Sequence, residues 1–423
     1  MIKIKKINMC DMCFFLMCFF LFDSAFHMTR FIFGGSNIGR LAILALMLIM
    51  VLVSKKGITI KGNNYYYLIF FLIALLLFSM VKTFILDGDI AFAASYIISF
   101  VYLLYLPILN YLIYDKKSLE RMLVAVTIIG SIVSVLSVLV LLFSFSSPML
   151  YDALIYYLYD HEIAVIIASF GVTVRIILSG VVFQVAAIFT GIYQYVSSNK
   201  KKRHLIFLGI NILGVYLTYS RALIAGTAVG LIVLVYYSRK YITSEKKRFN
   251  GLLVLALIMF VVIIFNVLIG DGKIGGVVEY LFDRLFGRSD DTNASAIFRE
   301  HMMGVIYEKI SNAPIFGHGL GGHIDLRDGT IEMTYHDIII KMGIIGLISF
   351  MLPYILMLFS VKKKKNYMLK SCLICALTSV MCATYYNPYL ITSTGLFVYC
   401  LCIRVFLLKE NIIKSSCHYL MNV

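Results

Sequence analysis

Apolar runs of about 20 residues recur along the whole chain, and they constrain the fold more than any other feature. A run of this length crosses the hydrocarbon core of a bilayer as one α-helix. The residues are 61% hydrophobic and only 14% charged, which excludes a soluble domain. The alternation of apolar and polar residues that is typical of an outer-membrane barrel is absent from the sequence. The sequence therefore predicts an all-α, polytopic membrane protein.

Most Lys and Arg residues stand in short clusters between the apolar runs. The net charge of +16 would suit nucleic-acid binding, but this clustered distribution indicates membrane topology instead, and we expect no nucleic-acid partner. Placing the clusters on the cytoplasmic side puts 26 of the 38 basic residues there and predicts about twelve spans with both termini inside. The expected spans are 9–27, 37–53, 65–82, 90–113, 122–145, 165–196, 205–219, 221–237, 251–269, 336–361, 368–386 and 389–408. The sixth of them is expected to begin with a re-entrant or interfacial piece.

A long connection over residues 270–335 divides the chain into three parts, because it falls on the outer face after nine spans. Residues 1–269 hold those nine spans, residues 270–335 form the large external loop, and residues 336–423 hold three further spans and a cytoplasmic tail. Within the loop, KIGGVVEYLFDRLFGR and ASAIFREHMMGVIYEKI predict short helices, the second of them amphipathic. The stretch NAPIFGHGLGGHIDLRDG predicts a turn-rich return to the membrane. PMLYDALIYYLYDHE suggests an additional interfacial helix.

Arg221 stands alone in the uncharged, mostly apolar stretch 205–237, directly after Ser220. A guanidinium in mid-bilayer costs about 2.5 to 3.5 kcal/mol even on insertion scales. Two short spans meet here, so we expect Arg221 at the outer surface, facing the bundle interior or a cavity. Its fork of N–H donors suits two phosphate oxygens at once. The alternative is an interfacial anchor that extends to the membrane surface.

Other arginines are candidates for the same anion. The outer region between Asp271 and Lys341 holds seven basic and eleven acidic residues, so it is no general cationic surface, and a phosphate bound there needs particular arginines. Arg299 lies on the amphipathic loop helix. Arg175, Arg284 and Arg288 could supply further cations. A solvated surface position is the alternative for each of them.

His336 lies where the long loop re-enters the membrane. Its imidazole could accept a proton from a sugar hydroxyl near neutral pH. Asp337 could orient such a base, or could complement a helix N-terminus. The alternative for His336 is an interfacial side chain bonded to a carbonyl.

The stretch GHGLGGHID contains three potential metal ligands, namely His318, His323 and Asp325. Their spacing matches no standard metal site, so we expect no metal. Its glycines favour a tight turn or a close backbone approach to a ligand. The nine Cys residues fall in expected spans or at their cytoplasmic ends, and we interpret them as small buried hydrophobes.

Three stretches, in this order, resemble the bacterial O-antigen polymerase and ligase family. TYSRALIAG is similar to the family's Ser-Arg at the start of a span. FREHMMGVIYEKISNAPIFGHGLGG is similar to its Arg-x-x-x-Trp helix followed by Pro, an apolar pair and Gly-x-Gly. YHDIIIKMGIIGLISF is similar to its His-Asn, Gly-apolar-x-Gly turn and span. The resemblance covers about residues 205–360, and the first 200 residues agree only in span number and charge pattern.

The chain departs from the family pattern at three positions. Met303 occupies the aromatic position, because the chain has no Trp. Asp337 replaces the usual Asn, and Lys341 stands where an acidic residue is frequent. These departures concern the acceptor side of the site.

The resemblance implies a class C glycosyltransferase of the bacterial cytoplasmic (inner) membrane. Such enzymes take a polyprenyl-diphosphate-linked oligosaccharide at the outer leaflet, with no cofactor, nucleotide sugar or obligate metal. Carried over by position, Arg221 and Arg299 would hold the diphosphate, and His336 would serve the acceptor. Ser220, Gly317, His318 and Gly319 lie in the matching stretches and complete the expected substrate-binding set.

Three functions are compatible with these residues. We favour a polymerase that joins lipid-linked repeats into a surface polysaccharide such as O-antigen or capsule, with inversion at the anomeric carbon. The second is a ligase that moves finished glycan from the lipid carrier to an acceptor. The third is a transporter or flippase, but the expected spans lack the embedded acids that relay protons or bind sodium. A chain-length regulator and a flippase are candidate protein partners of a polymerase.

Overall fold

A computed structural model of the chain describes residues 8–29, 37–54, 64–170, 173–197, 201–218, 220–238, 290–324, 331–361 and 367–408. These ranges are mostly helical. The helices are α1 (Met9–Phe26), α3 (Ile38–Val53), α4 (Asn64–Ile85), α5 (Ile90–Val101), the 3-10 helix η1 (Tyr102–Leu104), α6 (Tyr105–Leu112), α7 (Lys116–Ser146), α8 (Pro148–Asp160), α9 (Val181–Ser197), α10 (Lys201–Leu217), α11 (Arg221–Ser238), α14 (Asp290–Asn312), α15 (Thr334–Val361), α16 (Tyr367–Thr384) and α17 (Ser393–Leu407).

Five helical segments of the described chain are long and apolar enough to cross a membrane: Met9–Phe26, Tyr65–Ile85, Ile90–Leu112, Lys116–Ser144 and Thr334–Val361. Five shorter apolar helices accompany them: Ile38–Val53, Val181–Ser197, Arg221–Tyr237, Met368–Thr384 and Ser393–Leu407. The protein is therefore a multi-pass helical membrane protein, as the sequence predicts. The expected span 251–269 lies outside the described residues, and the total of twelve spans stays a prediction.

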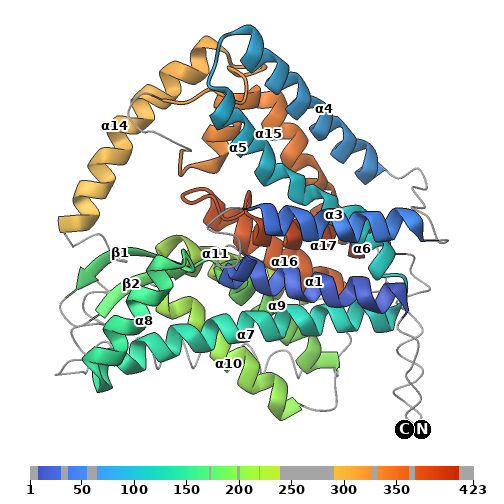
Figure 1. Cartoon of the computed structure of the whole chain (residues 1–423), viewed down its shortest axis with the longest axis vertical. Coiled ribbons are helices and arrows are strands. Elements are labelled where there is room, and N and C mark those ends of the chain that lie inside the picture. Colours follow the sequence, from blue (N-terminus) through green and yellow to red (C-terminus); the bar gives the residue numbers. More distant parts are fainter. Residues whose placement is uncertain are drawn as a thin grey trace.

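The helices form a layered bundle. In Figure 1, α1, α3 and α7 run across the view, and α8, β1, β2 and α14 lie toward its left-hand side. Helix α9 packs against α7, α10 and α16, while α4 and α5 form a second group with α15. The left-hand side holds the ends of α7 and α1 and the start of α3, which the charge pattern assigns to the outer face. We call this side the outer end of the bundle.

A β-hairpin replaces the first half of the expected span 165–196. Strands β1 (Ala164–Phe170) and β2 (Thr173–Leu178) pair antiparallel, with a register shift between Ile166 and Ala168. At the position of the expected re-entrant or interfacial piece the structure has a hairpin, because the run is rich in Val and Ile, which favour strands as well as apolar helices. The helical part begins only at Val181.

The expected span 90–113 is interrupted by a short change of helix type. Helix α5 passes into the 3-10 turn η1 before α6 begins. Pro107 lies in the first turn of α6 and has no N–H to donate to the preceding turn. The segment is therefore helical throughout, with a 3-10 turn between its two α-helical parts.

Helices α11 and α16 pack at close range through two glycines. A Cβ at Gly226 would lie 2.4 Å from the Ser379 carbonyl oxygen, and one at Gly230 would lie 2.7 Å from the Cys375 carbonyl oxygen. Glycines four residues apart allow two membrane helices to approach closely. This contact fixes the start of α11 relative to the end of α16.

The Gly226→Ala variant is expected to lose about 1 to 3 kcal/mol of stability, because its methyl group overpacks this interface. Thermal unfolding of the purified protein in detergent measures the loss. Gly191→Ala in α9 is the matched control, since a Cβ there meets no atom within 4 Å. Equal unfolding temperatures for the two variants would contradict the close contact.

Helix α14 spans the stretch ASAIFREHMMGVIYEKI, for which the sequence predicts a helix, and it packs on α15. Met302 and Ile306 are buried in a small apolar cluster that also holds Ile324, Met333 and Ile340. This cluster is separate from the main core of the bundle. It fastens the outer helix over the first turns of α15.

Candidate active site

Two predicted site segments meet at the turn that joins α16 to α17. The buried Ser220 hydroxyl, directly before α11, lies 3.2 Å from the Tyr389 hydroxyl. The Tyr335 hydroxyl, in the first turn of α15, donates to the Met381 carbonyl at 2.6 Å. The His336 ring lies 5.9 Å from the Tyr385 ring, centroid to centroid. The starts of α11 and α15 therefore share one neighbour at the outer end of the bundle.

Arg221 is the first residue of α11 and is half-buried. Ser220 stands directly before the helix, and its hydroxyl accepts from the Leu223 N–H at 3.5 Å. The free N–H groups of a helix N-terminus favour anions and disfavour a cation. The Arg221 guanidinium favours an oxyanion as its ligand, and the N–H groups at the start of α11 favour the same kind of ligand.

His336 lies in the first turn of α15 between two aromatic rings. Tyr307 of α14 is 6.2 Å away and Tyr385 is 5.9 Å away, both in edge-to-face geometry. Its Nδ1 atom is buried and finds no hydrogen-bond partner within the described part of the chain. A buried imidazole nitrogen without a partner is available to a substrate hydroxyl.

Asp337 lies in the first turn of α15, a position at which a carboxylate complements the helix N-terminus. Its buried carboxylate accepts a hydrogen bond from Lys341, one turn further along α15. The Lys341 ammonium also lies 4.3 Å from the centre of the Tyr96 ring and 5.0 Å from that of Phe92. The carboxylate is thus committed to an ion pair within α15, and the Lys341 ammonium of that pair contacts two rings of α5. We assign Asp337 to the support of the helix that carries His336.

The Asp337→Asn variant is expected to lose about 3 to 5 kcal/mol of stability, because it leaves the buried Lys341 ammonium uncompensated. The double variant Asp337→Leu, Lys341→Met should recover most of this loss, since both charges are then removed together. Unfolding temperatures of the three proteins in detergent test the pair. A double variant as unstable as the single one would contradict this assignment.

Helix α15 is broken close to this ion pair. Gly343 has a φ of 68°, and the backbone groups freed by the break pair with the segment before it. The Ile344 N–H donates to the Pro314 carbonyl at 2.9 Å, and the N–H groups of His318 and Gly319 donate to carbonyls just before the break at 2.7 and 3.0 Å. Irregular backbone at membrane depth requires such internal partners. Residues 313–319 therefore complete α15.

The glycines expected in a substrate loop allow this close approach. Gly317 has a φ of 65°, and a Cβ there would lie 2.5 Å from the Lys341 carbonyl carbon. Gly319 has a φ of 90°, and its Cβ would lie 2.8 Å from the Thr83 hydroxyl oxygen. The His318 Nε2 atom lies 2.7 Å from a backbone carbonyl oxygen of α14. These three residues join the outer segment to α15, α4 and α14.

The structure describes the other candidate arginines only in part. Arg299 lies in α14, eight residues and about two turns before Tyr307, and its side chain lies outside the described part. Arg175 stands in β2 opposite Ala168, again without a described side chain. Arg288, with the neighbouring Arg284, lies outside the described residues.

A polar cavity of about 590 Å³ opens beside the meeting point of α11 and α15. Tyr389 and Glu332 both line it, so it adjoins the partner of Ser220 on one side and the approach to α15 on the other. Its other walls come from the end of α1, the start of α3, the second half of α5 with η1, and the start of α9. A volume of this size falls within the range of about 300 to 1,000 Å³ that is usual for ligand sites.

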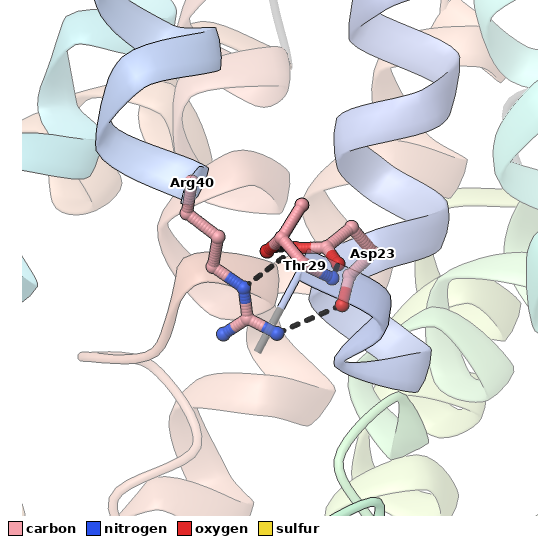
Figure 2. A network of polar contacts seen from close by, with 3 residues as sticks. All are labelled: Asp23, Thr29 and Arg40. Atoms are coloured by element: carbon pink, nitrogen blue, oxygen red, sulfur yellow. Dashed lines mark hydrogen bonds and ion pairs between the residues drawn. The ribbon is translucent and has the colours of Figure 1, made fainter. Parts of the chain in front are cut away.

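A buried ion pair that sequence reasoning missed supports one wall of the cavity. It corrects the expectation that the spans lack embedded acids, because Asp23 lies buried within α1 and within the expected span 9–27. Figure 2 shows Arg40, from α3, directed at Asp23 and Thr29 near the end of α1. The Arg40 Nε atom lies 2.7 Å from the Asp23 carboxylate, which also accepts from the Thr29 hydroxyl at 2.8 Å. The Arg40 guanidinium donates further to the Asp23 backbone carbonyl at 2.8 Å. Arg40 and Asp23 are 5% and 0% exposed, so the pair is part of the protein interior.

The apolar helices define a multi-pass membrane protein, and a cavity of the size usual for ligand sites opens within its bundle. Residues 205–351 match the family model described as O-antigen ligase. This match confirms the predicted resemblance to the O-antigen polymerase and ligase family, and it covers most of α10, all of α11 and α14, and α15 as far as Met351. No curated protein matches the chain. The match supports a membrane enzyme of the O-antigen ligase or polymerase type, with lipid-linked oligosaccharides as substrates.

Proposed function

We propose that the protein is a glycosyltransferase that polymerises polyprenyl-diphosphate-linked oligosaccharide repeats into a surface polysaccharide, such as O-antigen or capsule. The reaction takes place at the outer leaflet of the bacterial cytoplasmic membrane, with both chain termini in the cytoplasm. One observation carries the proposal: Ser220 and His336, next to the starts of α11 and α15, contact the same α16–α17 turn at Tyr389 and Tyr385. Arg221, which follows Ser220 and is the proposed phosphate-binding residue, and His336, the proposed base, can therefore act on one substrate.

Arg221 binds the diphosphate in this proposal. Its position at the start of α11 adds the N–H groups of the helix to the guanidinium donors. Arg299 supplies the second guanidinium from α14, whose later turn brings Tyr307 to His336. Arg175 and Arg288 are further candidates for the same anion. The lipid tail of the substrate holds the diphosphate at the depth of these groups.

The reaction is a single displacement. The acceptor hydroxyl oxygen forms a bond to the anomeric carbon of the donor, and the bond from that carbon to the diphosphate oxygen breaks. The bonding electron pair leaves with the diphosphate, where fixed cations stabilise the growing negative charge. The hydroxyl proton passes to a base. Attack opposite the leaving group inverts the anomeric carbon, and the step uses no metal.

His336 is the proposed base. Its buried Nδ1 atom has no hydrogen-bond partner among the described residues and would accept the hydroxyl proton, and the rings of Tyr307 and Tyr385 limit the motion of the imidazole. Asp337 and Lys341 keep the helix that carries His336 in place.

The experiment that tests the function combines deletion of the gene with transfer in detergent. Purified protein given lipid-linked repeats should produce longer lipid-linked chains of inverted configuration without a sealed compartment. Cells that lack the protein should carry a single repeat unit in place of the long polysaccharide chain. Retained configuration, or no transfer in detergent, would contradict the proposal.

Ligation is the second candidate, because the matching family model is described as O-antigen ligase. A ligase uses the same donor and the same diphosphate site, but transfers finished glycan to another acceptor. Cells that lack a ligase should accumulate unattached long chains. The gene deletion therefore separates the two activities.

A further inference from the structure

The polar cavity beside the active site is built from elements that are distant in sequence. It is lined by the end of α1, the start of α3, the second half of α5 with η1, the β2–α9 junction, Glu332 and the α16–α17 turn. The cavity therefore extends inward from the outer end of the bundle, where the substrate of the proposed function is presented. Tyr389 lines the cavity and contacts Ser220, and Glu332 lines it four residues before His336 in the sequence.

The lining of this cavity is rich in neutral hydrogen-bonding groups. It contains seven serines and threonines, two asparagines and two tyrosines. The contrast is a groove of about 460 Å³ between α3, α4, α5 and α6, whose walls are apolar side chains and Tyr66. Hydroxyl and amide groups arranged around a cavity can each donate and accept, as a ligand with several hydroxyl groups requires.

The charges around the cavity argue against an anionic ligand. Among the lining residues, Arg40 and Glu332 carry charges at neutral pH. The Arg40 guanidinium is already paired with the buried Asp23 carboxylate, as Figure 2 shows. Arg40 is the one arginine or lysine among the described lining residues, so a phosphate would find no unpaired guanidinium or ammonium group there. A second diphosphate is therefore disfavoured, and a neutral, hydroxyl-rich molecule fits the lining.

We propose that this cavity binds uncharged sugar residues of the saccharide substrate, while Arg221 binds the diphosphate. The inference rests on the proposed function, and it assigns the two chemical parts of one substrate to two adjacent places. The cavity then selects the repeat by the hydroxyl pattern of its sugars.

The absence of Trp from the natural chain gives a direct test of cavity occupancy. Ile98→Trp places a single fluorophore in the cavity wall, and Ile391→Trp places one on the α16–α17 side. Ile97→Trp is the matched control, because the neighbouring residue of α5 faces the apolar groove. The probe is a free oligosaccharide made by partial hydrolysis of the source cell's own surface polysaccharide, and inorganic pyrophosphate is the second probe.

The oligosaccharide should shift the fluorescence of Ile98→Trp and Ile391→Trp saturably and leave Ile97→Trp unchanged. Adding Ser99→Phe, which fills the cavity, should weaken this binding about tenfold or more. Pyrophosphate should produce no shift. A response to pyrophosphate in place of the oligosaccharide, or no response from either cavity reporter in protein that transfers sugar, would overturn the proposal. Binding without any transfer by the natural protein would support the cavity and refute the proposed function.

Discussion

Arg221→Ala is expected to abolish polymer formation while the protein stays in the membrane at its usual level. Removing one fixed donor to a developing negative charge costs about 10²- to 10³-fold in turnover. The loss is greatest here because Arg221 combines a guanidinium with the start of its own helix. Polymer length on gels, with an immunoblot of the membrane fraction, measures the effect.

Arg221→Lys should rescue poorly, because an ammonium cannot bind two phosphate oxygens through a planar fork. Arg121→Ala is the matched control. Arg121 is exposed near the start of α7, in a loose pair with Asp11 at 3.4 Å, on the face that the charge pattern assigns to the cytoplasm. Normal chains from Arg221→Ala would remove this residue from the mechanism.

His336→Ala is expected to lower the rate of transfer about 10²- to 10⁴-fold, the usual contribution of a positioned general base. His318→Ala and His323→Ala are controls from the neighbouring segment. His318 bonds to a backbone carbonyl of α14, and His323 is exposed and lies 3.1 Å from the Gly321 carbonyl oxygen. Initial rates with purified protein and lipid-linked repeats compare the three.

A uniform decrease in all three histidine variants would indicate a general structural effect and would contradict the assignment of His336. The unfolding temperature of each variant separates the two causes, since His336 has a buried nitrogen without a described partner. Its replacement should leave stability nearly unchanged. His318→Ala, in contrast, should lower stability and change the rate less.

Much of the helical architecture could be predicted from hydrophobic runs and charge clusters. Helices α1, α3, α4, α11, α15 and α17 begin within about four residues of the expected spans, because long apolar segments have few alternatives in a bilayer. The β1–β2 hairpin could not be predicted, since a Val- and Ile-rich segment is compatible with a strand or a helix. Hydropathy alone does not distinguish them.

The site was predictable only in part, because motifs name residues and not their neighbours. Arg221 and His336 stand out as polar groups next to apolar spans. The stretch YYNPYL at residues 385–390 was missed, although aromatic and turn residues between two spans were a usable signal for Tyr385 and Tyr389. The pairing of Asp23 with Arg40 joins two helices, and no local sequence pattern indicates it. The same is true of the segment that completes the broken α15.

The most direct test of the account is the binding of a polyprenyl diphosphate, without sugar, to the purified protein in detergent. Native mass spectrometry or a thermal-shift titration can compare the natural protein with Arg221→Ala, His336→Ala and Arg121→Ala. We predict that Arg221→Ala weakens binding about tenfold or more, which corresponds to at least 1.4 kcal/mol, while the other two variants bind normally. Unchanged affinity of Arg221→Ala would contradict the claim that the start of α11 holds the diphosphate.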